Sequence, residues 1–88
     1  MKLSDGFELV NIAEENIAVP VGYMTEKFQG VVVLNEAAAF LLENMKQSVT
    51  IDDLVRLLIK HYDVDHNRAC EDVNRMIGEL RQIGLVLD

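Results

Sequence analysis

The sequence predicts an α+β domain in which β-strands come first and α-helices follow. Short apolar runs rich in β-branched residues stand before residue 35, whereas apolar residues with helical spacing dominate after it. The change falls within residues 30–45, where four consecutive apolar residues run directly into a helical pattern. The chain has 88 residues, so we expect a single domain spanning residues 1–88.

Two strands are expected near the start of the chain, at residues 7–13 and 17–21. Apolar residues alternate with other residues in both segments, which places Phe7 and Leu9 on one face of the first strand. Residues 14–16, Glu-Glu-Asn, are predicted to form the turn because Asn tolerates positive φ. The two segments therefore predict a β-hairpin.

Two other segments of the N-terminal half are expected to be irregular. Residues 1–6 are mostly polar and are expected to be frayed. Residues 22–30 form a connection between two glycines, and its apolar residues are expected to fold over the core or to border a groove. The third strand follows directly and consists of Val31, Val32, Val33 and Leu34.

The first two helices are predicted from their N-terminal caps and their apolar spacing. The first is expected at about residues 36–46, with Asn35 as its N-cap. The second is expected at about residues 51–62, with Thr50 as its N-cap. Asp53 stands three residues after Thr50, which is the spacing of a capping box.

The third helix is expected at about residues 66–83, capped by Asp65 and ended by Gly84. Residues 85–87 form an apolar tail that we expect to pack back on the domain. Gly78 lies inside this helix, where Gly costs about 1 kcal/mol relative to Ala. It is expected to permit close packing or to leave room for a ligand side chain. The apolar stripe of this helix consists of Ala69, Val73, Met76, Leu80 and Ile83.

A three-stranded antiparallel sheet followed by three helices indicates a winged helix-turn-helix fold. This architecture is common among DNA-binding proteins, in which the third helix would enter the major groove. Here that helix carries as many acidic residues as arginines, and the chain has a formal net charge of −7 and a pI near 4.6. A winged-helix DNA-binding regulator is therefore the alternative function, ranked below peptide or protein binding.

Composition gives further bounds on function. Hydrophobic residues make up 50% of the chain, so a core is expected without metals or disulfides. The single cysteine fits a reducing cytosol. The N-terminus has no apolar segment typical of a signal peptide, and no apolar run approaches the roughly 20 residues of a membrane span. We therefore expect a cytoplasmic location.

No set of residues predicts catalysis, a metal site or a cofactor. His61, Asp63, Asp65 and His66 crowd together as possible metal ligands. However, the Gly and Glu that a calcium loop needs at its sixth and twelfth positions are missing, and capping alone explains Asp65. Cys70 lies on or beside the apolar stripe with no fixed base nearby in sequence, and it is expected to be a buried structural thiol. The protein is therefore expected not to be an enzyme.

A second stripe on the third helix carries mixed charge. It consists of Arg68, Asp72, Arg75, Met76 and Glu79, at spacings of one, three and four. It is interpreted either as a solvated face with internal ion pairs, such as Asp72 with Arg75 or Arg68, or as the wall of a peptide-binding groove. Periodicity alone favours the solvated face.

Several segments together resemble the PqqD-like proteins. They are the hairpin FELVNIA…IAVPVG, the run VVVLNEAAAFLLENM, the capped helix TIDDLVRLLIKHYDVD and the pattern AxxDVxxxIxxLxxxGLV. The resemblance covers about residues 7–86, and its specificity lies in the order and spacing of the segments.

The resemblance implies a peptide chaperone, also called a RiPP recognition element. Such domains bind the leader of a ribosomally made precursor peptide and present it to a modifying enzyme, often a radical S-adenosylmethionine (SAM) maturase. The leader adds as an extra strand to the third strand and lies in a groove against the third helix. The peptide-binding residues expected here are Val31, Val32, Val33, Leu34, Arg68, Asp72, Arg75, Met76 and Glu79.

The expected partners follow from this resemblance. The chain has no radical-enzyme cysteine motif, so the maturase would be a separate protein. An exposed third strand could also pair with a second copy, which predicts a possible homodimer. A protein-interaction domain with an unrelated partner is a further interpretation.

Overall fold

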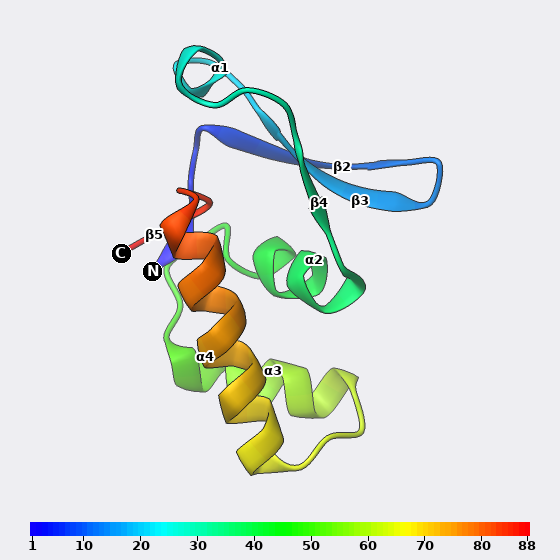
Figure 1. Ribbon diagram of the computed structural model, residues 1–88. Coiled ribbons are helices and arrows are strands. Elements are labelled where there is room, and N and C mark those ends of the chain that lie inside the picture. The colour runs from blue at the N-terminus through cyan, green and yellow to red at the C-terminus, as the bar shows by residue number, and fades with distance from the viewer.

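A computed structural model of the protein describes residues Met1–Asp88. The elements in chain order are β1 (Lys2–Leu3), β2 (Phe7–Ile12), β3 (Glu15–Pro20), α1 (Met24–Lys27), β4 (Val32–Leu34), α2 (Glu36–Glu43), α3 (Ile51–His61), α4 (His66–Gln82) and β5 (Val86–Leu87) (Figure 1). Strands β2, β3 and β4 form an antiparallel sheet in that order. The predicted α+β class with a three-stranded antiparallel sheet is confirmed, and the β2–β3 hairpin forms the wing beside helices α2, α3 and α4.

The hairpin turn lies one residue earlier than predicted. Ile12 pairs with Glu15, so the turn consists of Ala13 and Glu14, with φ of 53° and 70°. Two residues with positive φ match the right-handed twist of the flanking strands. The predicted turn at residues 14–16 is therefore wrong, because two of its three residues belong to β3. As a result, β2 ends before Ala13 and β3 begins two residues before the expected strand at 17–21.

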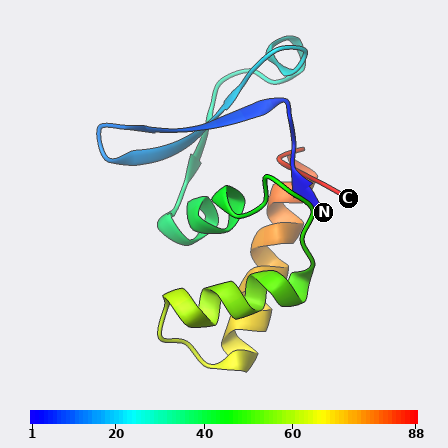
Figure 2. The same cartoon turned by 180° about the vertical axis from the view of Figure 1, so that it is seen from behind.

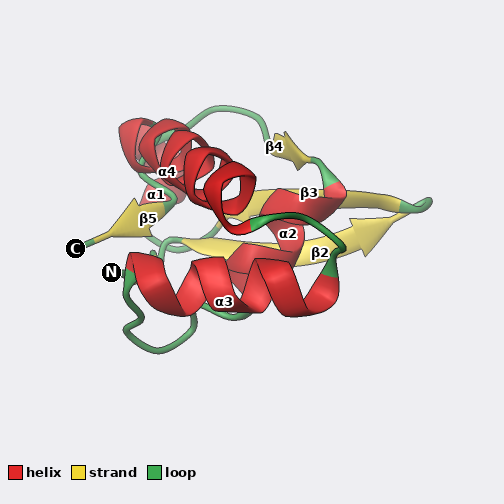
Figure 3. Ribbon diagram, turned by 90° about the horizontal axis from the view of Figure 1, so that it is seen from below, coloured by secondary structure: helices red, strands yellow, loops and turns green.

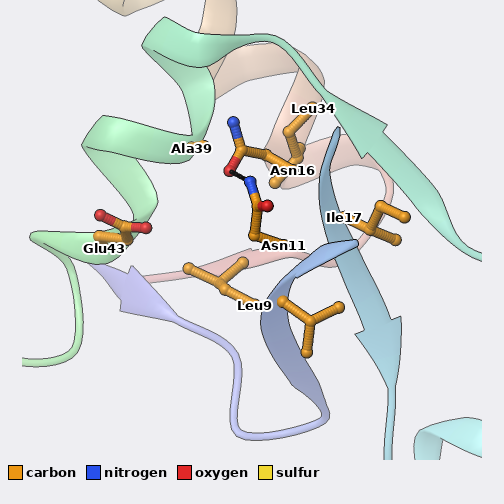
Figure 4. A pocket seen from close by; sticks show the side chains of 8 residues that line it. Leu9, Asn11, Asn16, Ile17, Leu34, Ala39 and Glu43 are labelled. Carbon is orange, nitrogen blue, oxygen red and sulfur yellow. Dashed lines mark hydrogen bonds between the residues drawn. The ribbon is translucent and has the colours of Figure 1, made fainter. Parts of the chain in front are cut away.

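The two faces of the sheet differ in burial. Phe7, Ala18 and Leu34 face the helices and are buried. Ile17 lies between Asn16 and Ala18 in sequence, and its side chain projects from the opposite face (Figure 4). Near the turn, the inner face is polar, because Asn11 Nδ2 donates a hydrogen bond of 3.1 Å to Asn16 Oδ1. One face therefore supplies the core, and the other has no helix against it.

Side-chain caps begin the three long helices, as expected from the sequence. Asn35 Oδ1 accepts from the Ala38 N–H at 2.7 Å. Thr50 and Asp53 form a capping box, with bonds of 3.1 and 3.0 Å. Asp65 Oδ1 accepts from the Arg68 N–H at 2.8 Å. Each cap satisfies an amide that has no partner within its helix.

The helices end slightly earlier than predicted. Helix α2 ends at Glu43 rather than near Lys46, because the Asn44 amide bonds back to the Leu41 carbonyl, which tightens the last turn. Helices α3 and α4 end at His61 and Gln82, each one residue before the expected end. The predicted third strand, β4, begins at Val32, one residue later than expected, so Val31 lies outside the ladder.

The N-terminus is ordered, so the prediction that residues 1–6 are frayed is wrong. Strand β1 pairs antiparallel with β5 in a second, two-stranded sheet. The Leu3 amide also donates to the Met45 carbonyl at 2.7 Å, and the Ser4 amide donates to Leu85 at 2.8 Å. The C-terminal tail packs back as expected, with Leu85 and Val86 buried. The two chain ends consequently lie side by side (Figures 1 and 2).

The connection between β3 and β4 contains the short helix α1, which was not predicted. Met24 and Phe28 pack against the core, and the Phe28 ring meets the Phe7 ring edge to face at 5.4 Å. Helix α4 packs against α3, while α2 contacts α3, β3 and β4 (Figure 3). The core lies between these helices and the inner sheet face. No helix is long and apolar enough to cross a membrane.

Candidate functional site

Strand β4 is an edge of the sheet. It pairs with β3 on one side only, through Val32, Val33 and Leu34. Asn35 caps α2 immediately afterwards, so the strand stops abruptly after three residues. The other long side of β4 therefore has backbone N–H and C=O groups without strand partners, and another extended chain can satisfy them.

A groove runs between this free edge and helix α4, and we call it the edge groove. It has a volume of about 230 Å³. Its lining residues are Val32, Val33, Leu34, Asn35 and Ala38 on one side and Met76, Glu79, Leu80 and Ile83 on the other. Seven of these nine residues are apolar, and Glu79 contributes the one charged side chain. Figure 3 shows β4 and α4 on the same side of the molecule.

A second hollow, the helix compartment, adjoins the edge groove. Its volume is about 210 Å³, and it shares Asn35 and Met76 with the edge groove. The remaining lining residues are Ala37, Leu58, Tyr62, Val64, Asp72 and Arg75. An extended chain lying along β4 would therefore meet an apolar surface beside the strand and, past Asn35, a hollow that Asp72 and Arg75 also line.

Carboxylates oppose the arginines of α4. Asp72 forms ion pairs with Arg68 at 3.4 Å and Arg75 at 3.3 Å. Arg81 pairs with Asp88 at 3.0 Å. All three arginines of this helix are thus engaged with carboxylates, and none lies in an unopposed basic patch. The prediction that Asp72 pairs with Arg75 or Arg68 is confirmed, since it pairs with both.

Tyr62 lines the helix compartment with an unusual hydroxyl. Its oxygen is buried and has no hydrogen-bond partner. Burial, followed by the nearby Glu36 carboxylate, raises the pKa of Tyr62 above its ordinary value of 10.0. The phenol therefore stays protonated, and its O–H remains a hydrogen-bond donor for which the chain provides no acceptor.

Comparison with known protein families shows which family the chain belongs to. The sequence matches the PqqD family, described as coenzyme PQQ synthesis protein D, over residues 8–86. The chain belongs to the PqqD family. Comparison with curated proteins gives no match.

Solved structures similar to this PqqD-family protein share its fold. One is TbiB1 in complex with the TbiA(beta) leader peptide, with a TM-score of 0.78, 16% identity and 100% of both chains covered. Another is lasso peptide synthetase B1 complexed with the leader peptide, with a TM-score of 0.76 and 17% identity. That match covers 99% of this chain and 96% of the other. The winged helix-turn-helix arrangement is therefore shared over the whole length.

The residues predicted for peptide binding in this PqqD-family chain are brought together in part. Five line the edge groove: Val32, Val33, Leu34, Met76 and Glu79. Asp72 and Arg75 line the helix compartment, which Met76 also borders. Val31 precedes β4 and Arg68 lies in the first turn of α4, and neither lines the edge groove or the helix compartment. Val33 borders the edge groove with its main chain, because its side chain alternates to the outer face, where it is 62% exposed.

Sequence reasoning missed several lining residues. Leu80 and Ile83 were assigned to the core stripe of the third helix, but Ile83 lies beyond the core and is 40% exposed. Tyr62 and Val64 reach the helix compartment from the end of α3 and the loop after it. The apolar stripe continuing past the last core residue was the available signal for Ile83. No local pattern indicates the contribution from α3.

The other sites weighed in this PqqD-family sequence do not assemble. No group of three or more His, Cys, Asp or Glu side chains has a geometry that could hold a metal ion. Asp65 is engaged in its cap, as capping predicts. Cys70 Sγ lies 3.7 Å from His66 Nδ1, and Cys70 is half-buried against the core, so the expectation of a buried thiol with no base nearby is wrong. The open hollow beside His66 is not lined by Cys70. Gly78 lines neither hollow, and a Cβ added there would meet nothing within 4 Å, so the expectation of close packing is wrong.

Proposed function

We propose that this protein is a non-catalytic peptide chaperone that binds the leader segment of a ribosomally made precursor peptide. The observation that carries the proposal is the free edge of β4 beside an apolar groove against α4. Membership of the PqqD family and the likeness to two leader-peptide complexes support it. No observation favours the DNA-binding alternative.

Strand addition explains how such a site combines affinity with selectivity. Backbone groups of an extended leader pair with the free edge of β4, and these main-chain hydrogen bonds do not depend on the amino-acid sequence of the leader. Alternate side chains of the leader then point into the edge groove, where Met76, Leu80 and Ile83 form an apolar wall. Because β4 has only three residues, the ladder is short, and much of the binding free energy must come from these side chains.

The partner of the loaded chaperone is proposed to be a separate modifying enzyme, with a radical SAM maturase as the leading candidate. The proposed place of action is the cytoplasm, where a ribosomally made precursor first meets its modifying enzyme. In the absence of leader, the free edge of β4 is also available to a second copy of this chain. We propose that such a dimer forms only without leader, since both occupants require the same backbone groups.

The test is an amide-resolved NMR titration of the protein with synthetic leaders, taken from small open reading frames neighbouring its gene. We expect shifts confined to Val32–Leu34 and the facing side of α4, together with loss of any β4-mediated dimer. Scrambled leaders of the same composition serve as the control. Shifts spread over the exposed face of α3 instead, or no shifts with any leader, would overturn the proposal.

A further inference from the structure

The outer face of the three-stranded sheet is an apolar surface that no other element covers. Its exposed or half-buried side chains are Val10, Ile12, Ile17, Val19 and Val33, and none of them packs against the core cluster. The register places Val10, Ile17 and Val33 in one row across the three strands. Ile12 is 58% exposed and Val33 is 62% exposed. Figures 1 and 2 show α2, α3 and α4 on the other side of the sheet.

The charged side chains on this surface are all negative. Glu8 and Glu15 alternate onto the same face, opposite Val19 and Ile12 in the register. Neither carboxylate takes part in an ion pair. No Lys or Arg occurs in β2, β3 or β4. The face therefore combines apolar side chains with unopposed negative charge.

We propose that this outer sheet face docks a second protein, which presents apolar side chains bordered by Lys or Arg. Exposed apolar surface with a polar border is typical of a protein-interaction site. The two carboxylates select the charge of the partner, because like charges brought together at an interface are unfavourable. They also disfavour a second copy of this chain as the occupant, since it offers no basic side chain on this face.

The proposal goes beyond leader binding and uses a different part of the molecule. Leader addition uses the free edge of β4 and the groove on the helix side, whereas docking uses side chains that point away from the helices. The two sites are therefore compatible in one complex. A leader strand added to β4 would continue the outer face by one strand, so the docked protein would contact the leader directly.

The experiment titrates the ¹⁵N-labelled full chain with an 18-residue amphipathic helical peptide that carries Leu on one face and Lys on the other. We expect amide shifts in β2 and β3 around Val10, Ile12 and Ile17, and none along α4. The same peptide with Glu in place of Lys should bind at least tenfold more weakly. The double variant Val10→Thr/Ile12→Thr should also bind the Lys peptide at least tenfold more weakly, because Thr keeps the strand preference but removes apolar area.

Leu87→Thr is the matched control, because Leu87 is 41% exposed in β5 and lies outside the outer face. It should bind the Lys peptide as the unaltered chain does. Equal binding of the Lys and Glu peptides, or no shifts in β2 and β3, would overturn the proposal. So would a dimer in sedimentation that the double variant dissociates, since the occupant would then be a second copy. Leader titrations of the double variant report on the proposed function separately and should be unchanged.

Discussion

At the scale of single residues, Tyr62 has the one buried side-chain polar atom that lacks a hydrogen-bond partner. A buried polar group left unsatisfied costs about 1–3 kcal/mol. Tyr62→Phe should therefore raise the free energy of unfolding by about 1 kcal/mol, measured by urea denaturation at pH 7. Leu58→Ala in the same compartment is the contrasting variant and should destabilise the fold. A destabilised Tyr62→Phe variant would show that the hydroxyl has a partner in solution.

The raised pKa of Tyr62 makes the free energy of unfolding depend on pH in the alkaline range. Its pKa is raised in the folded chain, so the folded state holds the proton more tightly than the unfolded state does. The stabilisation associated with this shift is complete below the ordinary value of 10.0 and is lost as pH rises through the folded pKa. Urea denaturation between pH 8 and pH 11 should show a smaller loss of stability in Tyr62→Phe than in the unaltered chain.

Gly78 is a helical position where a larger residue fits. An added Cβ would meet nothing within 4 Å, and the residue is exposed within α4. Gly78→Ala should therefore stabilise the protein by about 0.5–1 kcal/mol, because Ala loses less backbone entropy in a helix. The measurement is the thermal unfolding midpoint, and leader affinity should not change. A decrease in the midpoint would mean that the glycine has a conformational role.

At the scale of elements, the C-terminal end of α4 and its C-cap residue Ile83 supply apolar lining of the edge groove. Ile83 is 40% exposed there, so its substitution spares the core. Ile83→Thr should weaken leader binding about three- to tenfold, as expected for the loss of roughly 1 kcal/mol of apolar contact. Calorimetry with the leader found by NMR would measure this. Leu87→Thr, with similar exposure in β5, should leave the affinity unchanged.

The capping box of α3 predicts how acid affects that element. Hydrogen bonds from Thr50, first its backbone N–H and then its hydroxyl, lower the pKa of Asp53 below its ordinary value of 3.8. The stabilisation is therefore present above pH 3.8 and is lost as pH falls through the folded pKa. Asp53→Asn should lose less stability than the unaltered chain between pH 6 and pH 3 in urea denaturation. Asp52→Asn is the control, because Asp52 makes no capping hydrogen bond. Equal losses in all three proteins would contradict the role of Asp53.

Elements with a strong local signal could be predicted, and those that depend on distant partners could not. Asn35, Thr50 and Asp65 each cap a helix through the third amide, a relation readable over four residues. The hairpin turn was misplaced because Ala13 and Glu14 take positive φ without the usual Gly or Asn. Strands β1 and β5 have two residues each and pair across the whole length of the chain, so neither carries a pattern of its own.

The candidate site shows the same limit. Strand β4 and the α4 positions Met76 and Glu79 followed from the resemblance and from helical spacing. Arg68 shares a helix face with Asp72, but it lies in the first turn of α4 and lines neither hollow. How far along the helix the hollows extend was not readable from helical spacing. The contribution of α3 and its following loop depends on tertiary packing, which a linear pattern does not contain.

At the scale of the whole molecule, the charge distribution separates peptide binding from DNA binding. The net charge is −7, and all three arginines of α4 pair with carboxylates. Duplex DNA should therefore show no binding at micromolar protein in fluorescence anisotropy at low salt. The labelled leader provides the positive control. Binding to duplex DNA that weakens as salt increases would contradict this prediction.

The pairing of β1 with β5 has a consequence for how this fold can be joined to other chains. Lys2 is opposite Leu87 in the ladder, so the polypeptide enters and leaves the domain at one point. A short linker between the ends would give a circular permutant without stretching either strand. For the same reason, the whole domain can be inserted into a surface loop of an enzyme, and the host would need only two neighbouring attachment points.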